Sequence, residues 1–92
     1  MSLKPESVPQ QTPGFRLEVL DQEVILLRPS DGKIVQCNET AGLVFRLCDA
    51  NRSVQEIAHL LSEAYPESKA QVANDVHEAL STLVAADVII II

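Results

Sequence analysis

The spacing of apolar side chains changes once along this chain, at Asn38, and this change constrains the fold more than any other feature. Before Asn38 the apolar residues alternate with polar ones or form short β-branched runs, as they do in strands. After Asn38 they recur every three or four residues, the spacing of amphipathic helices. With 92 residues the chain has room for one domain. The pattern therefore predicts an α+β domain with its strands first and its helices second.

Three strands are expected ahead of Asn38. The middle one is continuously aliphatic, which suits the centre of a sheet. Nothing else in the first half of the chain is left to pair with the third, so we expect it at an edge. The expected elements are a strand over residues 15–19, a turn at Asp21 and Gln22, a central strand over 24–27, a Pro-Ser-Asp-Gly turn over 29–32 and an edge strand over 33–37.

Two capped helices are expected directly after the strands. Asn38 is a favoured N-cap for the first helix, which ends near Asp49. Ser53 and Glu56 have the spacing of a capping box, in which each side chain bonds a free backbone N–H of the other residue. A second helix therefore begins just after Ser53.

A third and longer helix is expected after Tyr65 and Pro66, because proline disfavours helical geometry in the residue before it. Ser68, with Gln71 three residues later, predicts a capped start, and the apolar spacing continues to about Ala86. The order β-β-β-α-α-α is that of a winged-helix-like domain, with a three-stranded antiparallel sheet followed by three helices.

The two ends of the chain differ in composition. Residues 1–13 hold three of the five prolines and only scattered aliphatic residues, so we expect a flexible tail over residues 1–14 and a folded domain over residues 15–92. Residues 88–92 are apolar without interruption. They are expected to form either a buried C-terminal strand or an adhesive tail.

The charge of the chain narrows its partners. Seven Lys and Arg stand against thirteen Asp and Glu, a formal charge of -6, which repels phosphate backbones and anionic membranes. The N-terminus lacks a basic patch followed by an apolar region, and the longest apolar run is far short of the roughly 20 residues that span a bilayer. We therefore expect a cytoplasmic protein that binds neither nucleic acid nor a membrane.

No pattern typical of catalysis or cofactor binding is present in the sequence. The acidic residues of the helical half fall mainly on the polar sides of the helices, so solvated faces explain them. Cys37, Cys48, His59 and His77 are separated by 11, 11 and 18 residues, which matches no recognised zinc spacing. Both cysteines suit reduced thiols in apolar surroundings. We expect a protein that is not an enzyme and needs neither metal nor cofactor.

Two alternatives follow from the helical half of the chain. Its helices resemble a helix-turn-helix, which makes a winged-helix DNA-binding regulator the second hypothesis. Between residues 53 and 92, however, Lys69 is the one basic residue against six acidic ones, and phosphates would repel a recognition helix of that charge. A structural oligomerisation domain, built on residues 88–92 or on exchanged edge strands, is the third hypothesis.

The residues themselves point to an interaction module. An edge strand over residues 33–37 would present free backbone N–H and C=O groups, to which an extended peptide can add as a fourth strand. If the third helix flanks that edge, the two form a groove long enough for a short peptide. The alternative is that the N-terminal tail or a second protomer covers the edge.

An ordered set of short motifs resembles a known family. The motifs are Cys37-Asn38-Glu39-Thr40-Ala41, Leu47-Cys48-Asp49, Ser53-Val54 with Ile57, Leu61, Tyr65-Pro66, and Asp75-Val76 followed by Leu80 and Leu83. Together they resemble the PqqD family, the peptide-recognition proteins of ribosomal peptide modification, also called RiPP recognition elements. The similarity runs from about Phe15 to Val88, nearly the whole expected domain.

This resemblance implies a non-catalytic chaperone. Such a protein binds the leader of a ribosomally made precursor peptide and presents it to a modifying enzyme, often a radical SAM protein, and a homodimer is compatible with it. The leader adds to the third strand and lies against the third helix. The implied peptide-binding residues are Lys33, Ile34, Val35, Gln36 and Cys37 on the strand, and Val72, Asp75, Val76, Ala79 and Leu80 on the helix.

The chain departs from the family pattern at two helix ends. Family members commonly have Gly after the Asp of the first helix and again shortly before the final apolar residues, where this chain has Ala50 and Ala86-Asp87. We therefore expect these helix ends to be shaped differently. The pathway stays open between pyrroloquinoline quinone (PQQ) biosynthesis and other RiPP systems.

Overall fold

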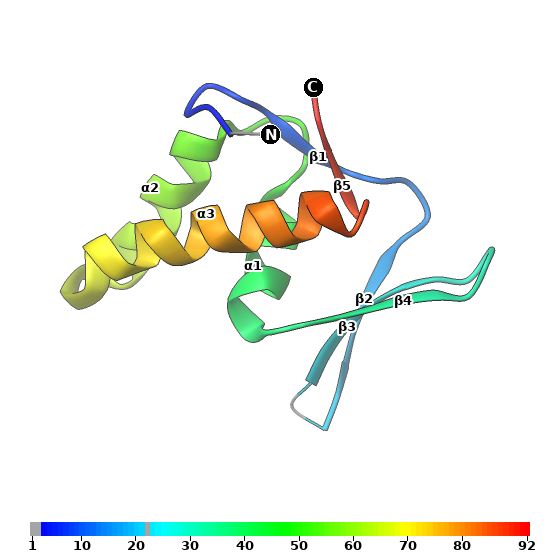
Figure 1. The fold of residues 1–92 in the computed structure, drawn as a ribbon. Helices are drawn as coiled ribbons and strands as arrows, with labels where there is room; N and C mark the ends of the chain where they lie inside the picture. Colours follow the sequence, from blue (N-terminus) through cyan, green and yellow to red (C-terminus); the bar gives the residue numbers. More distant parts are fainter. Residues whose placement is uncertain (1–2, 22) are drawn as a thin grey trace.

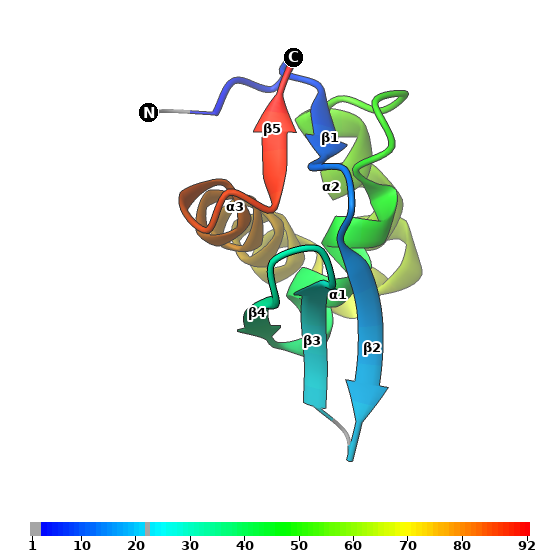
Figure 2. The ribbon, with the colours of Figure 1, turned by 90° about the vertical axis from the view of Figure 1, so that its right-hand side faces the viewer.

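The computed structural model describes residues 3–21 and 23–92 and contains a sheet, a layer of helices and a pair of terminal strands (Figure 1). Its elements are β1 (Pro9–Gln11), β2 (Arg16–Leu20), β3 (Glu23–Arg28), β4 (Lys33–Cys37), α1 (Glu39–Leu47), α2 (Val54–Ala64), a 3₁₀ turn η1 (Pro66–Ser68), α3 (Lys69–Ala85) and β5 (Ile89–Ile91). Strands β1 and β5 lie side by side at one end, and β2, β3 and β4 extend at the other (Figure 2). The winged-helix-like α+β class predicted from the sequence is confirmed.

The three-stranded sheet is the antiparallel meander that the strand pattern predicts. Its order is β2-β3-β4, and Leu26 at its centre stands opposite Leu17 and Val35. Strand β4 has the bounds expected for it and, within the described residues, pairs with β3 alone, which confirms its edge position. The expected turn at Asp21 falls partly on Gln22, which lies outside the described residues.

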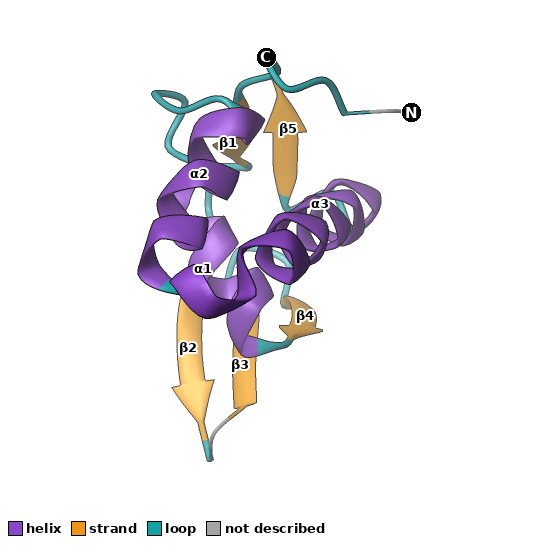
Figure 3. Ribbon diagram, turned by 90° about the vertical axis from the view of Figure 1, so that its left-hand side faces the viewer, coloured by secondary structure: helices purple, strands orange, loops and turns teal. Residues whose placement is uncertain are grey.

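A single apolar core joins the sheet to the helices. Figure 3 shows the helices gathered on one side of the three-stranded sheet. Leu26 of the sheet belongs to the same buried cluster as the apolar stripes of the three helices, and none of the described residues is a buried polar or charged one. Fully burying one large aliphatic side chain contributes about 1.5–3 kcal/mol. The largest fully buried helical side chains are Val44, Ile57, Val76, Leu80 and Leu83. Within residues 3–21 and 23–92, no helix combines the length and the apolar character needed to cross a membrane.

The first two helices begin as predicted. The Asn38 Oδ1 accepts a hydrogen bond from the Ala41 N–H at 2.8 Å, as an N-cap should. The Ser53 N–H donates to Glu56 Oε1 at 2.9 Å, and the Glu56 N–H donates to Ser53 Oγ at 3.1 Å, which completes the capping box. Asn38 alone separates β4 from α1, so the first helix follows the edge strand without an intervening loop.

The predicted side-chain cap of the third helix is wrong. Ser68 makes no capping bond, because residues Pro66–Ser68 form a 3₁₀ turn that leads into α3. Pro66 takes the first position of that turn, where its missing N–H costs nothing. Ser68 therefore has φ -128° and ψ 28°, away from the extended backbone that a Ser cap needs.

The expected flexible tail over residues 1–14 is wrong for residues 9–11. They form β1, which pairs antiparallel with β5, so residues 88–92 include a strand, the first of the two alternatives, in which Val88 and Ile89 are buried but Ile90 is exposed. The segment also bonds the start of α2, where the Val54 N–H donates to the Ser7 carbonyl and the Gln55 N–H to the Pro5 carbonyl. Composition missed this because the ordering entropy is offset by a partner strand at the far end of the chain.

The two helix ends that lack the family glycines keep a left-handed backbone. Ala50 has φ 69° and Asp87 has φ 62°, although non-glycine residues seldom adopt this conformation. At the end of α3 the Val88 N–H bonds the Leu83 carbonyl and the Asp87 N–H bonds the Val84 carbonyl, as in a Schellman motif. Both helix ends therefore form left-handed turns without a glycine, and a difference in shape from the relatives stays a prediction.

Candidate peptide-docking groove

The turn before β4 determines which residues of β4 face its free edge. In antiparallel strands, directly opposed residues are alternately hydrogen-bonded to each other and not. Arg28 and Lys33 are the opposed pair next to the turn. If these two residues were not hydrogen-bonded to each other, the next pair, Pro29 and Gly32, would have to be. That is impossible, because proline has no N–H and the Gly32 N–H already donates to the Arg28 carbonyl at 2.8 Å. Arg28 and Lys33 are therefore a bonded pair.

Counting in alternation from that pair shows which residues of β4 hydrogen-bond β3 and which do not. Val35 and Cys37 also bond β3, whereas Ile34 and Gln36 direct their N–H and C=O groups away from it. Within the described residues β4 has no other partner strand. Ile34 and Gln36 therefore offer open donors and acceptors to an added strand.

An ion pair in the same turn supports the start of β4. The Arg28 Nη2 lies 2.6 Å from Asp31 Oδ2, and the Lys33 N–H donates to Asp31 Oδ1 at 3.1 Å. The hydrogen bond from Arg28 lowers the pKa of the Asp31 carboxyl to about 2. A carboxyl with a lowered pKa contributes stability above its unfolded pKa of about 4 and loses it only as the pH falls through the folded value. The turn therefore keeps this contact throughout the neutral range.

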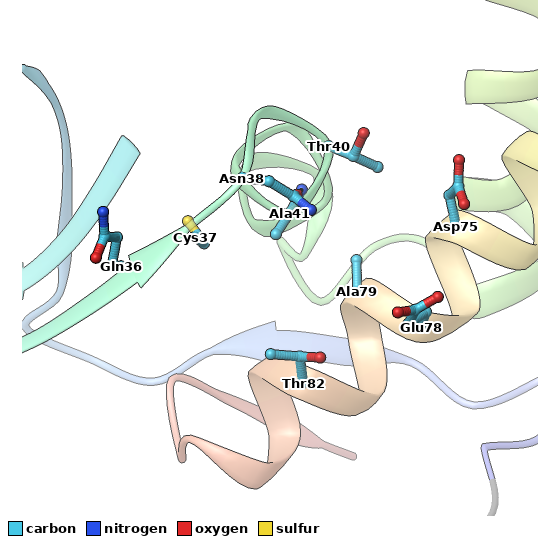
Figure 4. Close-up of a pocket in the computed structure, with 9 residues that line it drawn as sticks. All are labelled: Gln36, Cys37, Asn38, Thr40, Ala41, Asp75, Glu78, Ala79 and Thr82. Atoms are coloured by element: carbon cyan, nitrogen blue, oxygen red, sulfur yellow. Dashed lines mark hydrogen bonds between the residues drawn. The ribbon is translucent and has the colours of Figure 1, made fainter. Parts of the chain in front are cut away.

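Helix α3 forms the second side of a groove beside β4. The Lys33 Nζ donates to the Ala86 carbonyl at 2.8 Å, and at the other end of the strand Cys37 shares a cleft with Ala79, so β4 and α3 run in opposite directions. That cleft has a volume of about 400 Å³, and Figure 4 shows the residues that line it. Its lining, which defines the β4–α3 groove, is Gln36, Cys37, Asn38, Thr40, Ala41, Asp75, Glu78, Ala79 and Thr82.

A smaller cleft continues the groove past the start of α1. Its volume is about 80 Å³, and it shares Thr40 and Asp75 with the β4–α3 groove. Its remaining lining, which defines the Tyr65 cleft, is Glu39, Leu43, Leu61, Tyr65 and Val72. The two hollows together follow one side of α3 for most of its length.

The structure brings several of the predicted peptide-binding residues together. Gln36, Cys37, Asp75 and Ala79 line the β4–α3 groove, and Val72 lines the Tyr65 cleft. On β4 itself, the Ile34 side chain is 61% exposed, the half-buried Val35 packs toward the core, and Lys33 is held at the closed end of the groove.

Two of the predicted residues, Val76 and Leu80, do not lie on the groove surface. Both are fully buried in the core beneath it. The family resemblance implies both as peptide-binding residues, but an apolar stripe with helical spacing packs inward on its own domain first. The surface that faces β4 is the adjacent side of α3, which carries Asp75, Glu78, Ala79 and Thr82.

Sequence reasoning missed five lining residues, namely Asn38, Thr40, Ala41, Glu78 and Thr82. Those on α3 were available from spacing, because Asp75, Glu78 and Thr82 follow one another at three and four residues and therefore share a side of the helix. Asn38 and its neighbours follow β4 directly, so the end of the groove had to be formed by the start of α1.

The groove contains the thiol of Cys37, and the described residues form no metal-binding cluster. Partial burial raises the pKa of the Cys37 thiol, so the thiol stays protonated at neutral pH and is a poor nucleophile. Among residues 3–21 and 23–92 there is no group of three or more His, Cys, Asp or Glu side chains arranged to hold a metal ion. The chemistry that the groove offers is backbone pairing and side-chain contact.

The opposite edge of the sheet, β2, is also open in the described part of the chain. Along β3, residues that hydrogen-bond β4, such as Leu26, alternate with residues that hydrogen-bond β2. Leu17 and Val19 of β2 stand opposite residues of the first kind, so their backbone N–H and C=O groups point away from the sheet. Val19 is 58% exposed. A cleft of about 490 Å³ lies there, lined by Leu17, Val19, Val24, Glu39, Gly42, Leu43 and Arg46. The β2 edge has only the shorter α1 beside it, whereas β4 has α3 along its length.

The fold and the groove define a class: small winged-helix-like domains with an open edge strand beside a long helix. The family profile described as Coenzyme PQQ synthesis protein D (PqqD) matches residues 23–89. A PqqA binding protein from Methylococcus capsulatus (strain ATCC 33009 / NCIMB 11132 / Bath) is 30% identical over 84 residues, which cover 89% of this chain and 86% of the relative. The chain belongs to the PqqD family.

Solved structures share this fold. The PqqD truncation of Methylobacterium extorquens PqqCD, a stand-alone RiPP recognition element, is 24% identical with a TM-score of 0.76, covering 97% of this chain and 95% of that one. Lasso peptide synthetase B1 complexed with the leader peptide is 19% identical with a TM-score of 0.68, over 90% and 98% of the two chains. TbiB1 in complex with the TbiA(β) leader peptide is 18% identical with a TM-score of 0.65, over 87% and 93%.

Proposed function

We propose that this protein is a peptide chaperone that binds the leader of a ribosomally made precursor peptide as a fourth strand on β4. The observation that carries the proposal is the open edge at Ile34 and Gln36, which lies beside a groove bounded by α3. Backbone pairing supplies affinity in strand addition, and the pockets for alternate side chains supply specificity. The PqqA-binding relative and the two neighbours solved with leader peptides support the same reading.

In this proposal the protein contributes no catalytic group. It holds the leader in the cytoplasm and leaves the remainder of the precursor free for a modifying enzyme, for which a radical SAM protein is the expected class. The protonated state of the Cys37 thiol fits a groove that binds without reacting.

Isothermal titration calorimetry against PqqA, the peptide named for the relative, tests the proposal. We expect one peptide per chain with a Kd of about 1 μM, equivalent to about -8 kcal/mol. A scrambled PqqA of the same composition is the control and should release no heat. No binding of PqqA at about 100 μM would contradict its assignment as the ligand.

A further inference from the structure

The charges on the groove and on the Tyr65 cleft all have the same sign. The charged side chains that line these two hollows are Glu39, Asp75 and Glu78, and no Lys, Arg or His stands in either lining. The nearest base on β4, Lys33, is bonded to the Ala86 carbonyl at the closed end. A guest strand in the groove therefore lies in a negative field.

Two of these carboxylates are placed to meet the guest directly. Asp75 and Glu78 lie one turn apart on α3 and face the cleft between α3 and the start of α1 (Figure 4). Asp75 is half-buried, and within residues 3–21 and 23–92 neither side chain has a salt-bridge partner. A cation beside them gains attraction that water screens only in part, and an anion there is repelled.

The start of α1, which lies in the lining of both hollows, opposes this preference, since a helix N-terminus carries partial positive charge. Two groups already counter that charge. Asn38 Oδ1 accepts the Ala41 N–H, and Glu39 places a carboxylate in the first turn. The open end of the groove is therefore negative overall.

Strand geometry adds a second requirement on the guest. Alternate side chains of an added strand point to opposite faces of the sheet. Those on the helix side meet α3, and those on the other side lie next to Ile34, an exposed aliphatic side chain. An apolar residue is favoured beside Ile34, because cross-strand apolar pairs stabilise sheets.

We infer that the β4–α3 groove selects leader peptides with two features. They carry Lys or Arg opposite Asp75 and Glu78, and they carry an apolar residue that packs on Ile34. The basic and the apolar residue are separated by an odd number of positions, because they point to opposite faces of the added strand. This inference rests on the proposed function. It names the chemical class of peptide that the groove accepts, namely extended basic-apolar segments, and it assigns Asp75 and Glu78 as the residues that determine that specificity.

Selection from a displayed library of random 12-residue peptides tests the inference with the full chain. The first variant is the double substitution Asp75→Asn with Glu78→Gln. Its matched control is Glu6→Gln with Glu23→Gln, which removes the same charge from two exposed sites outside the groove. The variant Gln36→Pro removes an outward N–H and so identifies peptides that bind by strand addition. Circular dichroism checks that each variant keeps its helical content.

We expect the unsubstituted chain to enrich peptides with Lys or Arg an odd number of positions from an aliphatic residue. Their affinity should fall about fivefold in the groove variant, and less than twofold in the control. Peptides that lose binding in the Gln36→Pro variant but show no basic preference would overturn the inference and leave the proposed function standing. A library that yields no peptide sensitive to Gln36→Pro would count against the proposed function itself.

Discussion

Replacing Gln36 by proline is expected to weaken peptide binding about 30- to 100-fold while leaving the fold intact. The substitution removes an N–H that points away from β3, so no bond of the native sheet is lost. The guest loses one backbone bond, and its carbonyl is left unpaired beside the proline ring, which together cost about 2–3 kcal/mol. Calorimetry with PqqA and with the library-selected peptides measures the loss.

Val35→Pro is the matched control for this prediction, because the Val35 N–H points the other way, into the ladder with β3. It should lower the free energy of unfolding by about 1–3 kcal/mol, whereas Gln36→Pro should lower it by much less. Urea denaturation compares the two. If Gln36→Pro bound peptide as tightly as the unsubstituted chain, the guest would not pair with β4.

Replacing Leu80 by alanine is expected to lower the free energy of unfolding by about 3–4 kcal/mol. Leu80 is fully buried in the core, where α3 packs against α1 and α2. Its loss leaves a cavity that close-packed neighbours fill only in part. For a domain of this size, such a change removes a large share of the total stability. Urea or thermal denaturation followed by circular dichroism measures it.

Val72→Ala is the surface counterpart on the same helix. Val72 is half-buried in the Tyr65 cleft, so we expect its loss to cost roughly 1 kcal/mol of stability and to weaken peptide binding. If Leu80→Ala instead kept full stability and lowered only peptide affinity, Leu80 would be a groove residue, as the family resemblance implies.

Much of the fold could be predicted because local rules determine it. The period change at Asn38, the Ser53 capping box and the turn ahead of Lys33 each depend on neighbours within four residues. Strand β1 could not be predicted, because Pro9 and its neighbours gain order only from β5 at the far end of the chain. The 3₁₀ turn at Pro66 displaced the expected Ser68 cap for a similar reason, since two local preferences competed for one segment.

Part of the candidate site could also be predicted from the sequence, and part could not. Strand β4 was predicted with its bounds, because an edge strand follows from counting possible partners. The resemblance also implies Val76 and Leu80, which the structure places in the core, because apolar positions with helical spacing form the inward side of a helix. Asp75 and Ala79, which flank that side, do line the groove.

Amide hydrogen exchange, measured residue by residue by NMR with and without peptide, tests the central claim most directly. In the free protein the amides of Ile34 and Gln36 should exchange fast, and Val35, already bonded to β3, should exchange slowly. Saturating peptide should slow exchange at Ile34 and Gln36 at least tenfold and leave Leu17 and Val19 on the β2 edge unchanged. Unchanged exchange at Ile34 and Gln36, or protection at Leu17 and Val19 instead, would contradict strand addition on β4.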